Sequence, residues 1–181
     1  NPGSLRKSYG SWFGFVEEEG DLSTVESQAF RRVQDWLRSL ETTPMSKSFK
    51  MVTLDVLLAH DALFTGMSVA DLSDRCHAYL LRNPELYRDI EGVKALLDPE
   101  APKPVAWRKY WGEVPIQDWC GGKRTWFRLD DGVFRFRAVQ AADGAQQKAI
   151  EELTRQVVDW RLARYRRRQP AVDGAKDSFV C

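Results

Sequence analysis

Residues 125–137 have the sequence TWFRLDDGVFRFR, which predicts a β-hairpin and anchors the interpretation of the whole chain. Asp131-Gly132 is a strong signal for a two-residue type I′ turn, because that turn needs positive φ at both central positions. A two-residue loop also fixes the register, so that Arg128 faces Arg135 and Trp126 faces Arg137. Side chains alternate along a strand, and one face therefore collects the apolar residues Phe127, Leu129, Phe134 and Phe136.

The opposite face of this hairpin collects Trp126, Arg128, Arg135 and Arg137. Like charges directly opposite each other destabilise a β-ladder. We therefore expect an external anion to relieve the repulsion, and the phosphate backbone of a nucleic acid is the first candidate. An alternative remains open, in which Arg137 stacks on Trp126 and the other guanidinium groups are simply solvated.

The composition is that of an ordinary globular protein whose basic character is local. The chain has 181 residues, 43% of them hydrophobic and 29% charged, which fits one domain with a substantial core. Its formal net charge is only +1, so any attraction to nucleic acid must come from local clusters. Three widely spaced cysteines without a C-x-x-C pair favour a reduced, cytoplasmic protein. No apolar run approaches the roughly 18 residues of a membrane helix, so no membrane partner is expected.

Apolar periodicity predicts a mainly α fold with a small β-hairpin. The expected helices cover about residues 23–41, residues 47–64, a stretch capped by Ser68, residues 84–97 with Asn83 as N-cap, and residues 145–168. Residues 47–64 are apolar nearly all round, which predicts a central buried helix. The order of elements resembles a winged helix whose wing is the hairpin. An extra helix and a Pro/Trp segment precede the wing, and a further helix is added at the C-terminal side.

Three parts are expected along the chain. Residues 1–21 form an aromatic arm that packs back on the domain, and residues 22–169 form the helical domain that contains the wing-like hairpin 125–137. Residues 170–181 are expected to connect to a following domain, because an apolar run is only beginning at Phe179.

Residues that would carry a reaction are few. The motifs G-x-x-x-x-G-K-[ST] and G-x-G-x-x-G are both absent, so this chain is not expected to contain a nucleotide-hydrolysing motor. His60 and His77 lack a partner at metal-ligand spacing, and Cys120 lacks an obvious His partner. Asp130 and Asp131 are more typical of hairpin turns than of metal sites. We therefore expect no enzyme, no catalytic residue, no metal and no cofactor.

Basic residues with aromatic neighbours favour a binding role, because this combination suits phosphate contacts and stacking on exposed bases. The candidate nucleic-acid-binding residues are Lys47, Lys50, Lys123, Arg124, Trp126, Arg128, Arg135, Arg137, Arg164 and Arg167. The basic end of the last helix has a second explanation, since the helix dipole stabilises cations at any helix C-terminus. Asp71 and Asp74 argue against the helix after Ser68 as a reader of the DNA groove, which leaves the wing as the better candidate.

Several segments resemble parts of large bacterial superfamily 2 (DEAD/DEAH-box) helicases. They are residues 10–15 (GSWFGF), 41–52 (ETTPMSKSFKMV), 158–165 (VDWRLARY) and 178–181 (SFVC). Helicases of this kind often belong to restriction and phage-defence loci, and the similar module lies C-terminal to their two motor lobes. The resemblance implies that helicase activity belongs to the parent protein and to no residue of this chain.

Two functions follow as hypotheses. The first is a non-catalytic domain that binds or guides DNA, with RNA as a second candidate, for a cytoplasmic helicase whose motor lobes lie in the same parent chain. The alternative is a protein-interaction or scaffold module that links the motor to a nuclease or a partner subunit, with the Trp-rich residues 107–119 as its contact patch.

Overall fold

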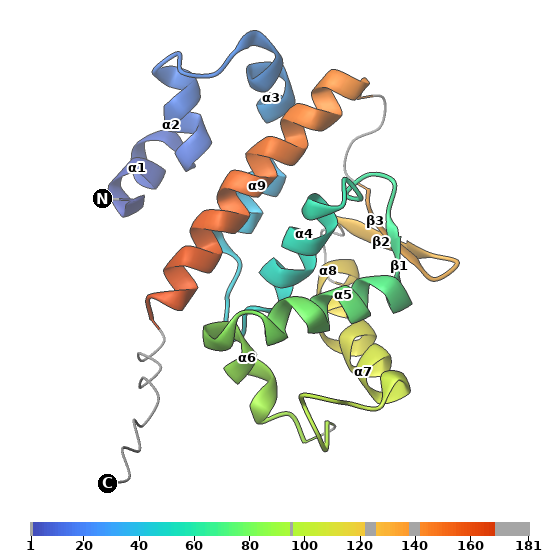
Figure 1. Cartoon of the computed structure of the whole chain (residues 1–181). Helices are drawn as coiled ribbons and strands as arrows, with labels where there is room; N and C mark the ends of the chain where they lie inside the picture. The colour runs from blue at the N-terminus through green and yellow to red at the C-terminus, as the bar shows by residue number, and fades with distance from the viewer. Residues whose placement is uncertain (1, 95, 122–125, 138–141, 169–181) are drawn as a thin grey trace, which may run out of the picture.

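The computed structural model describes residues 2–94, 96–121, 126–137 and 142–168, which form a mainly α-helical fold with a small three-stranded antiparallel sheet (Figure 1). The elements before the sheet's first strand are α1 (Pro2–Tyr9), α2 (Trp12–Glu18), α3 (Thr24–Thr42) and α4 (Phe49–Ala59). The strand β1 (Met67–Ser68) is followed by α5 (Val69–Leu81), α6 (Pro84–Glu91), α7 (Pro104–Trp111), the π-helix η1 (Gly112–Ile116) and α8 (Gln117–Cys120). The hairpin strands β2 (Phe127–Asp130) and β3 (Val133–Phe136) precede α9 (Gly144–Arg166). Within these ranges, no helix is both long enough and apolar enough to cross a membrane.

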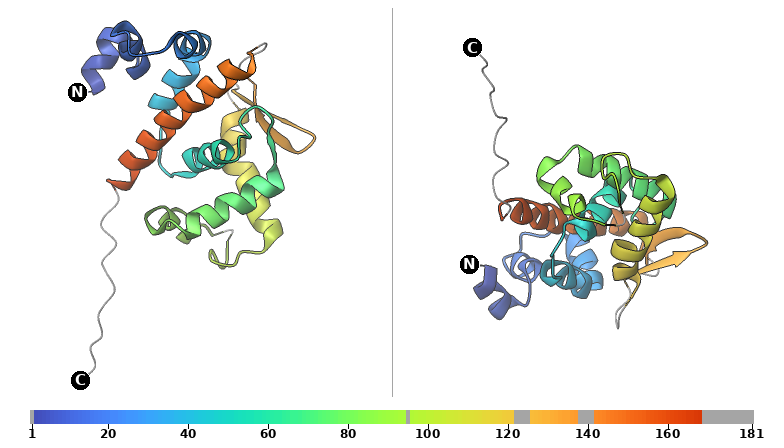
Figure 2. Two further views of the ribbon diagram at one scale, coloured as in Figure 1. Left: turned by 45° about the horizontal axis from the view of Figure 1, so that its top comes forward. Right: turned by 90° about the horizontal axis from the view of Figure 1, so that it is seen from below.

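The helix α4 is the central buried helix that the sequence predicts. It packs against α5 and α9, and α9 in turn runs along α3, as the two views of Figure 2 show. Leu54 and Leu57 on α4 have no exposed surface. The predicted range 47–64 is too long at both ends. Ser48 is held outside the helix by a bond to Asp89, and the chain turns at Asp61, whose φ is +50°.

The N-terminal arm packs back on the domain, as expected, and does so as two short helices. The hydroxyl of Ser11 accepts the N–H of Gly14 at 2.9 Å and so caps α2. Phe13 is buried, with its ring centre 6.4 Å from that of Phe30 on α3. The predicted capping box of Ser23 and Glu26 begins α3, with both of its hydrogen bonds formed.

The hairpin has the predicted turn and register. Asp131 and Gly132 have φ of +48° and +75°, as a type I′ turn requires, and Arg128 pairs with Arg135. Phe127 and Phe134 are buried and stacked, with ring centres 4.6 Å apart. Leu129 lies opposite Phe134, as the predicted register requires, but its side chain is 48% exposed.

The third strand, β1, was not expected. It pairs with β3, so the strand order is β1-β3-β2. The preceding Gly66 has φ of +85°, and a Cβ built there would lie 2.8 Å from Cβ of Arg135. Glycine is therefore required at this position twice over, for its backbone conformation and for the close approach to β3.

Residues 84–120 differ most from the expectation. The predicted helix over residues 84–97 ends at Glu91, and Leu97, expected on its buried stripe, is 93% exposed. The side chain of Asn83 does not cap α6; its amide instead donates to the carbonyl of Tyr79 at 2.7 Å. The Pro/Trp segment, which carried no predicted helix, forms α7, η1 and α8.

Cys76 lies on the buried face of α5 with no exposed surface, and burial raises the pKa of its thiol well above the usual value. We predict that a thiol reagent labels Cys76 far more slowly than Cys120 in the native protein, because Cys120 is only half-buried. Peptide mapping by mass spectrometry after a short exposure to the reagent measures both rates. Equal labelling of the two thiols in the folded chain would contradict this placement.

Candidate nucleic-acid interface

The arginine face of the hairpin is present, and part of its charge is already balanced. Arg128 and Arg135 are cross-strand partners, as the register predicts. The guanidinium of Arg128, however, forms an ion pair with Asp130 on the same strand face, with Nε 2.8 Å from Oδ2. Both side chains are about half exposed, so this pair contributes little to stability. Asp130 thus relieves some of the repulsion that the sequence assigned to an external anion.

Arg135 and Trp126 are the less exposed members of this face. Arg135 lies on the central strand, and its buried Nε has no hydrogen-bond partner among the residues that the structure describes. A buried donor of this kind is unusual and favours a bound water or anion. Trp126 is half-buried with its ring centre 5.7 Å from that of Trp36, so its ring serves first to anchor β2 to α3. Arg137 is exposed, and its N–H donates to the carbonyl of Trp126 at 2.8 Å.

Two of the predicted binding lysines are engaged within the domain. Lys47 donates to the carbonyl of Asp89 at 2.5 Å, and its ammonium lies 5.1 Å from the centre of the Phe49 ring. Lys50 lies 3.3 Å from Oδ2 of Asp118 and 5.7 Å from the ring centre of Trp119. These contacts give both lysines a packing role. Lys123 and Arg124 fall outside the described residues.

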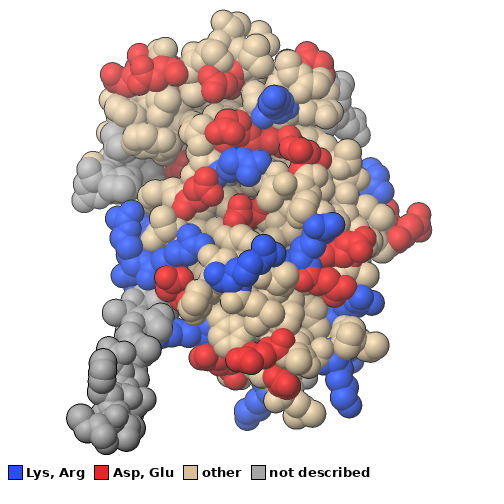
Figure 3. All heavy atoms as spheres, in the orientation of Figure 1, with Lys and Arg blue, Asp and Glu red and all other residues tan. Residues whose placement is uncertain are grey.

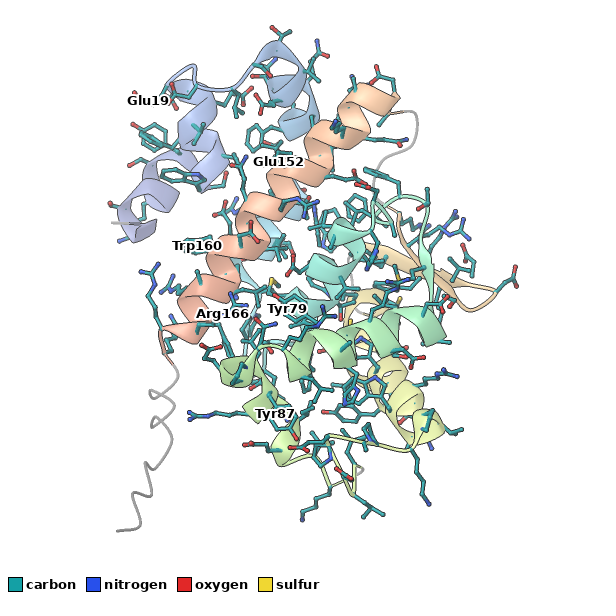
Figure 4. All side chains as sticks on the ribbon, viewed as in Figure 1. Glu19, Tyr79, Tyr87, Glu152, Trp160 and Arg166 are labelled. Atoms are coloured by element: carbon teal, nitrogen blue, oxygen red, sulfur yellow. The ribbon has the colours of Figure 1, made fainter. Side chains whose placement is uncertain are left out.

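The basic end of α9 divides into internal and exposed arginines. Arg166 donates to the hydroxyl of Tyr79 on α5 at 3.3 Å and to Oδ1 of Asn83 at 3.0 Å (Figure 4). Burial and Asp55 raise the pKa of Tyr79 to about 12, so its hydroxyl stays protonated. Arg164 and Arg167, the two predicted binding residues here, are exposed.

The two basic regions do not form one surface. Figures 1 and 2 place the hairpin and the C-terminal end of α9 on opposite sides of the molecule. On the face in Figure 3, basic and acidic side chains alternate over most of the area, and basic ones gather over the end of α9. The structure therefore keeps Arg128, Arg135 and Arg137 together on the hairpin, packs the ring of Trp126 against Trp36, and leaves Arg164 and Arg167 in a separate group.

Sequence reasoning missed the helices that lead into the hairpin. The segment α7–η1–α8 packs on α5, and α8 contacts β2. Arg108 on α7 forms an ion pair with Asp74 of α5 at 2.6 Å, which raises the pKa of Arg108. Trp107 and Trp111, spaced four residues apart after a helix-starting proline, were the signal that could have predicted α7.

The same segment was the expected contact patch of a scaffold module, and its tryptophans are not available for that role. Trp107, Trp111 and Trp119 are at most 5% exposed. The indole N–H of Trp107 donates to the carbonyl of Ser73 at 2.7 Å. These side chains belong to the core, so the exposed aromatic patch on which the scaffold hypothesis relied is absent from residues 107–119.

Among the described residues, no group of three or more His, Cys, Asp and Glu side chains could hold a metal ion. Comparison of the chain with family models, with curated proteins and with solved structures gives no match in any of the three.

Proposed function

We propose that this chain is a non-catalytic nucleic-acid-binding domain of winged-helix type whose wing is the hairpin of β2 and β3. The observation that carries the proposal is the arginine face on one side of that hairpin, with Arg128 opposite Arg135 and Arg137 directly after the end of β3. Guanidinium groups present paired donors that suit the phosphate oxygens of a nucleic-acid backbone.

The order of the elements supports the winged-helix comparison. A short strand between two helices pairs with the second strand of a later hairpin, which gives the order β1-β3-β2. In this comparison α4, α5 and α7–η1–α8 are the three helices, and α6 is an insertion between the second and the third. Of the three, α5 and α7–η1–α8 are the helix-turn-helix pair, so Asp71 and Asp74 lie on the first helix of the pair and not on the recognition helix that enters a groove.

The proposed parent is a superfamily 2 helicase of the restriction or phage-defence type, with this domain guiding DNA relative to the motor lobes. The resemblance of residues 10–15, 41–52 and 158–165 supports this assignment. These segments meet in space, since the N–H of Trp12 donates to the carboxylate of Glu41, and Arg161 donates to the carbonyls of Glu41 and Thr43. They therefore form one structural unit, which is what a shared module requires.

The test is the triple variant Arg128→Gln, Arg135→Gln and Arg137→Gln, which we call the wing variant. We predict weaker binding to all DNA sequences alike, and a salt dependence that is flatter by roughly one unit of slope for each phosphate that the variant no longer neutralises. The free energy of unfolding should stay within about 0.5 kcal/mol of that of the unmodified chain or rise slightly, because the variant removes like charges that face each other across the ladder. Filter binding over a series of salt concentrations measures the first effect, and thermal unfolding the second.

The matched control removes the same charge elsewhere, by changing the exposed residues Arg32, Lys94 and Lys148 to Gln. It should lower binding much less than the wing variant does. If the wing variant unfolds, the arginines have a structural role. If it binds DNA and RNA as tightly as the unmodified chain does, the arginines do not contribute to binding. A scaffold module that joins the motor to a nuclease or partner subunit would then be the better hypothesis.

A further inference from the structure

A pocket lies between the end of α3 and the last turns of α9. Figures 1 and 2 show the C-terminal end of α9 on the side of the molecule away from the hairpin. The pocket has a volume of about 270 Å³ and is lined by residues 41–45, by Arg161, Arg164 and Tyr165 of α9, and by Arg168 just beyond the end of α9. We call it the arginine pocket. Its volume lies just below the range of about 300–1,000 Å³ that is usual for drug-sized ligands, so it suits a small group.

The wall formed by residues 41–45 is held in place by partners from distant parts of the chain. Arg161 donates to the carbonyls of Glu41 and Thr43, and its Nε lies 3.3 Å from Sδ of Met45. Glu41 is only 3% exposed, and its carboxylate accepts the N–H of Trp12 at 3.1 and 3.3 Å. A loop fixed in this way sacrifices little conformational freedom when a ligand binds, which favours affinity.

These contacts are more polar than stability alone would require. Buried charged groups can often be replaced by well-packed apolar residues without any decrease in stability, or with an increase. The wall nevertheless depends on a buried carboxylate and on Arg161, whose donors point at main-chain carbonyls. The arrangement therefore favours a defined pocket shape as its role.

The charge of the pocket is positive. Three arginines line it against one carboxylate, and that carboxylate already accepts a main-chain N–H. Arg164 on α9 and Arg168, just beyond the end of α9, are both exposed and line the same pocket, so their like charges repel each other. The guanidinium of Arg164 lies 5.5 Å from the ring centre of Trp160, which restrains its orientation.

The remaining polar groups agree with an anionic ligand. The hydroxyls of Thr42 and Tyr165 are engaged elsewhere, with the carbonyl of Arg38 and with Asp89. The hydroxyl of Thr43 makes no hydrogen bond to another residue that the structure describes, and it is available as a donor. The dipole of α9 also favours cations in this turn, but it does not account for a concave site with a fixed opposite wall.

We propose that the arginine pocket binds a phosphate group. Guanidinium groups present paired donors that match phosphate oxygens, and the two exposed arginines that line the pocket, Arg164 and Arg168, can offer them to one phosphate. The group belongs either to a nucleic-acid strand or to a free phosphate or nucleotide. The arginine pocket is separate from the hairpin, so the proposal that it binds phosphate does not depend on the proposal that the wing binds nucleic acid.

The first experiment titrates the folded chain with inorganic phosphate by calorimetry, at an ionic strength kept constant with chloride. We expect saturable binding of phosphate. The double variant Arg164→Gln, Arg168→Gln, which we call the pocket variant, should weaken that binding about ten-fold or more, because it removes charge-assisted hydrogen bonds. The control variant Arg32→Gln, Lys148→Gln removes the same charge from exposed positions outside the pocket, and it should bind phosphate as tightly as the unmodified chain does. Thermal unfolding without phosphate verifies that the variants are folded.

The second experiment identifies the source of the phosphate, with an oligonucleotide that carries either a 5′-phosphate or a 5′-hydroxyl. If the pocket variant weakens only the 5′-phosphorylated strand, the pocket holds a strand end, and if it weakens both, it holds an internal phosphodiester. If it weakens neither and inorganic phosphate still binds the parent, the ligand is a free phosphate or nucleotide. Equal binding of phosphate to the parent and to the pocket variant, or no binding beyond that of chloride, would overturn the proposal.

The wing variant separates this inference from the proposed function. Changing Arg128, Arg135 and Arg137 to Gln should leave the affinity for inorganic phosphate unchanged. A loss of phosphate binding in that variant alone would place the phosphate site on the hairpin and remove it from the pocket.

Discussion

Replacing Leu57 with Ala should lower the free energy of unfolding by about 2–5 kcal/mol. Leu57 has no exposed surface and lies on α4, which packs against both α5 and α9. The substitution removes three buried carbon atoms and leaves a cavity that the surrounding side chains fill only in part. Urea unfolding followed by circular dichroism measures the change, and the slope of the transition should stay constant if only stability is affected.

Leu97 provides the matched control, because the same Leu→Ala change there removes a side chain that is 93% exposed. We expect that variant to stay within about 0.5 kcal/mol of the parent. If the two substitutions were equally harmless, α4 would not be the centre of the core.

The features that the sequence predicted correctly are those governed by local rules. The hairpin register follows from the two residues of its turn, and the capping box of Ser23 and Glu26 from their three-residue spacing. The central position of α4 follows from its apolar surface, which has no polar stripe to expose to water. None of these inferences requires knowledge of which distant segment lies opposite.

The features that it missed depend on distant partners. The strand β1 is two residues long, too short for an alternating pattern, and it exists because β3 offers an unpaired edge. Leu97 fits a helical stripe that extends residues 84–91, but the chain leaves the helix at Gly92 before that residue is reached. A periodic pattern shows that a helix is possible and does not show where tertiary contacts end it.

The candidate site divides in the same way. The arginine face was predictable, since strand alternation alone places Arg128, Arg135 and Arg137 together. The ion pair of Lys50 with Asp118 was not, and neither were the contacts of Arg161 with carbonyls 118 and 120 residues away. The sequence alone does not distinguish a basic side chain that is solvated from one that binds a ligand or one that bonds to a distant part of the same chain.

Asp89 is the second position at which we expect a large effect. This residue of α6 is 8% exposed and joins three parts of the chain. One carboxylate oxygen accepts the N–H and the hydroxyl of Ser48 at 2.7 and 2.5 Å, and the other accepts the hydroxyl of Tyr165 on α9 at 2.6 Å. The carboxylate therefore fixes the turn before α4 and the last turns of α9 at once.

Asp89→Ala should lower the free energy of unfolding by about 3–5 kcal/mol, because both donors of Ser48 lose a charged acceptor and the hydroxyl of Tyr165 keeps only its longer hydrogen bond to the carbonyl of Ser46, at 3.3 Å. Tyr165→Phe should cost less, about 1.5–3 kcal/mol, since it removes one of the three bonds and leaves the carboxylate with its other two. Asp21→Ala is the control, as that carboxylate is exposed, and it should change stability by less than about 0.5 kcal/mol. Urea unfolding of the three variants tests the order of these effects.

If Asp89→Ala destabilised the chain no more than Asp21→Ala does, the junction of α4, α6 and α9 would be held by its apolar packing alone. In that case the phosphate affinity of the neighbouring arginine pocket should also survive the substitution, whereas a carboxylate that positions Tyr165 in the pocket wall predicts that the affinity falls.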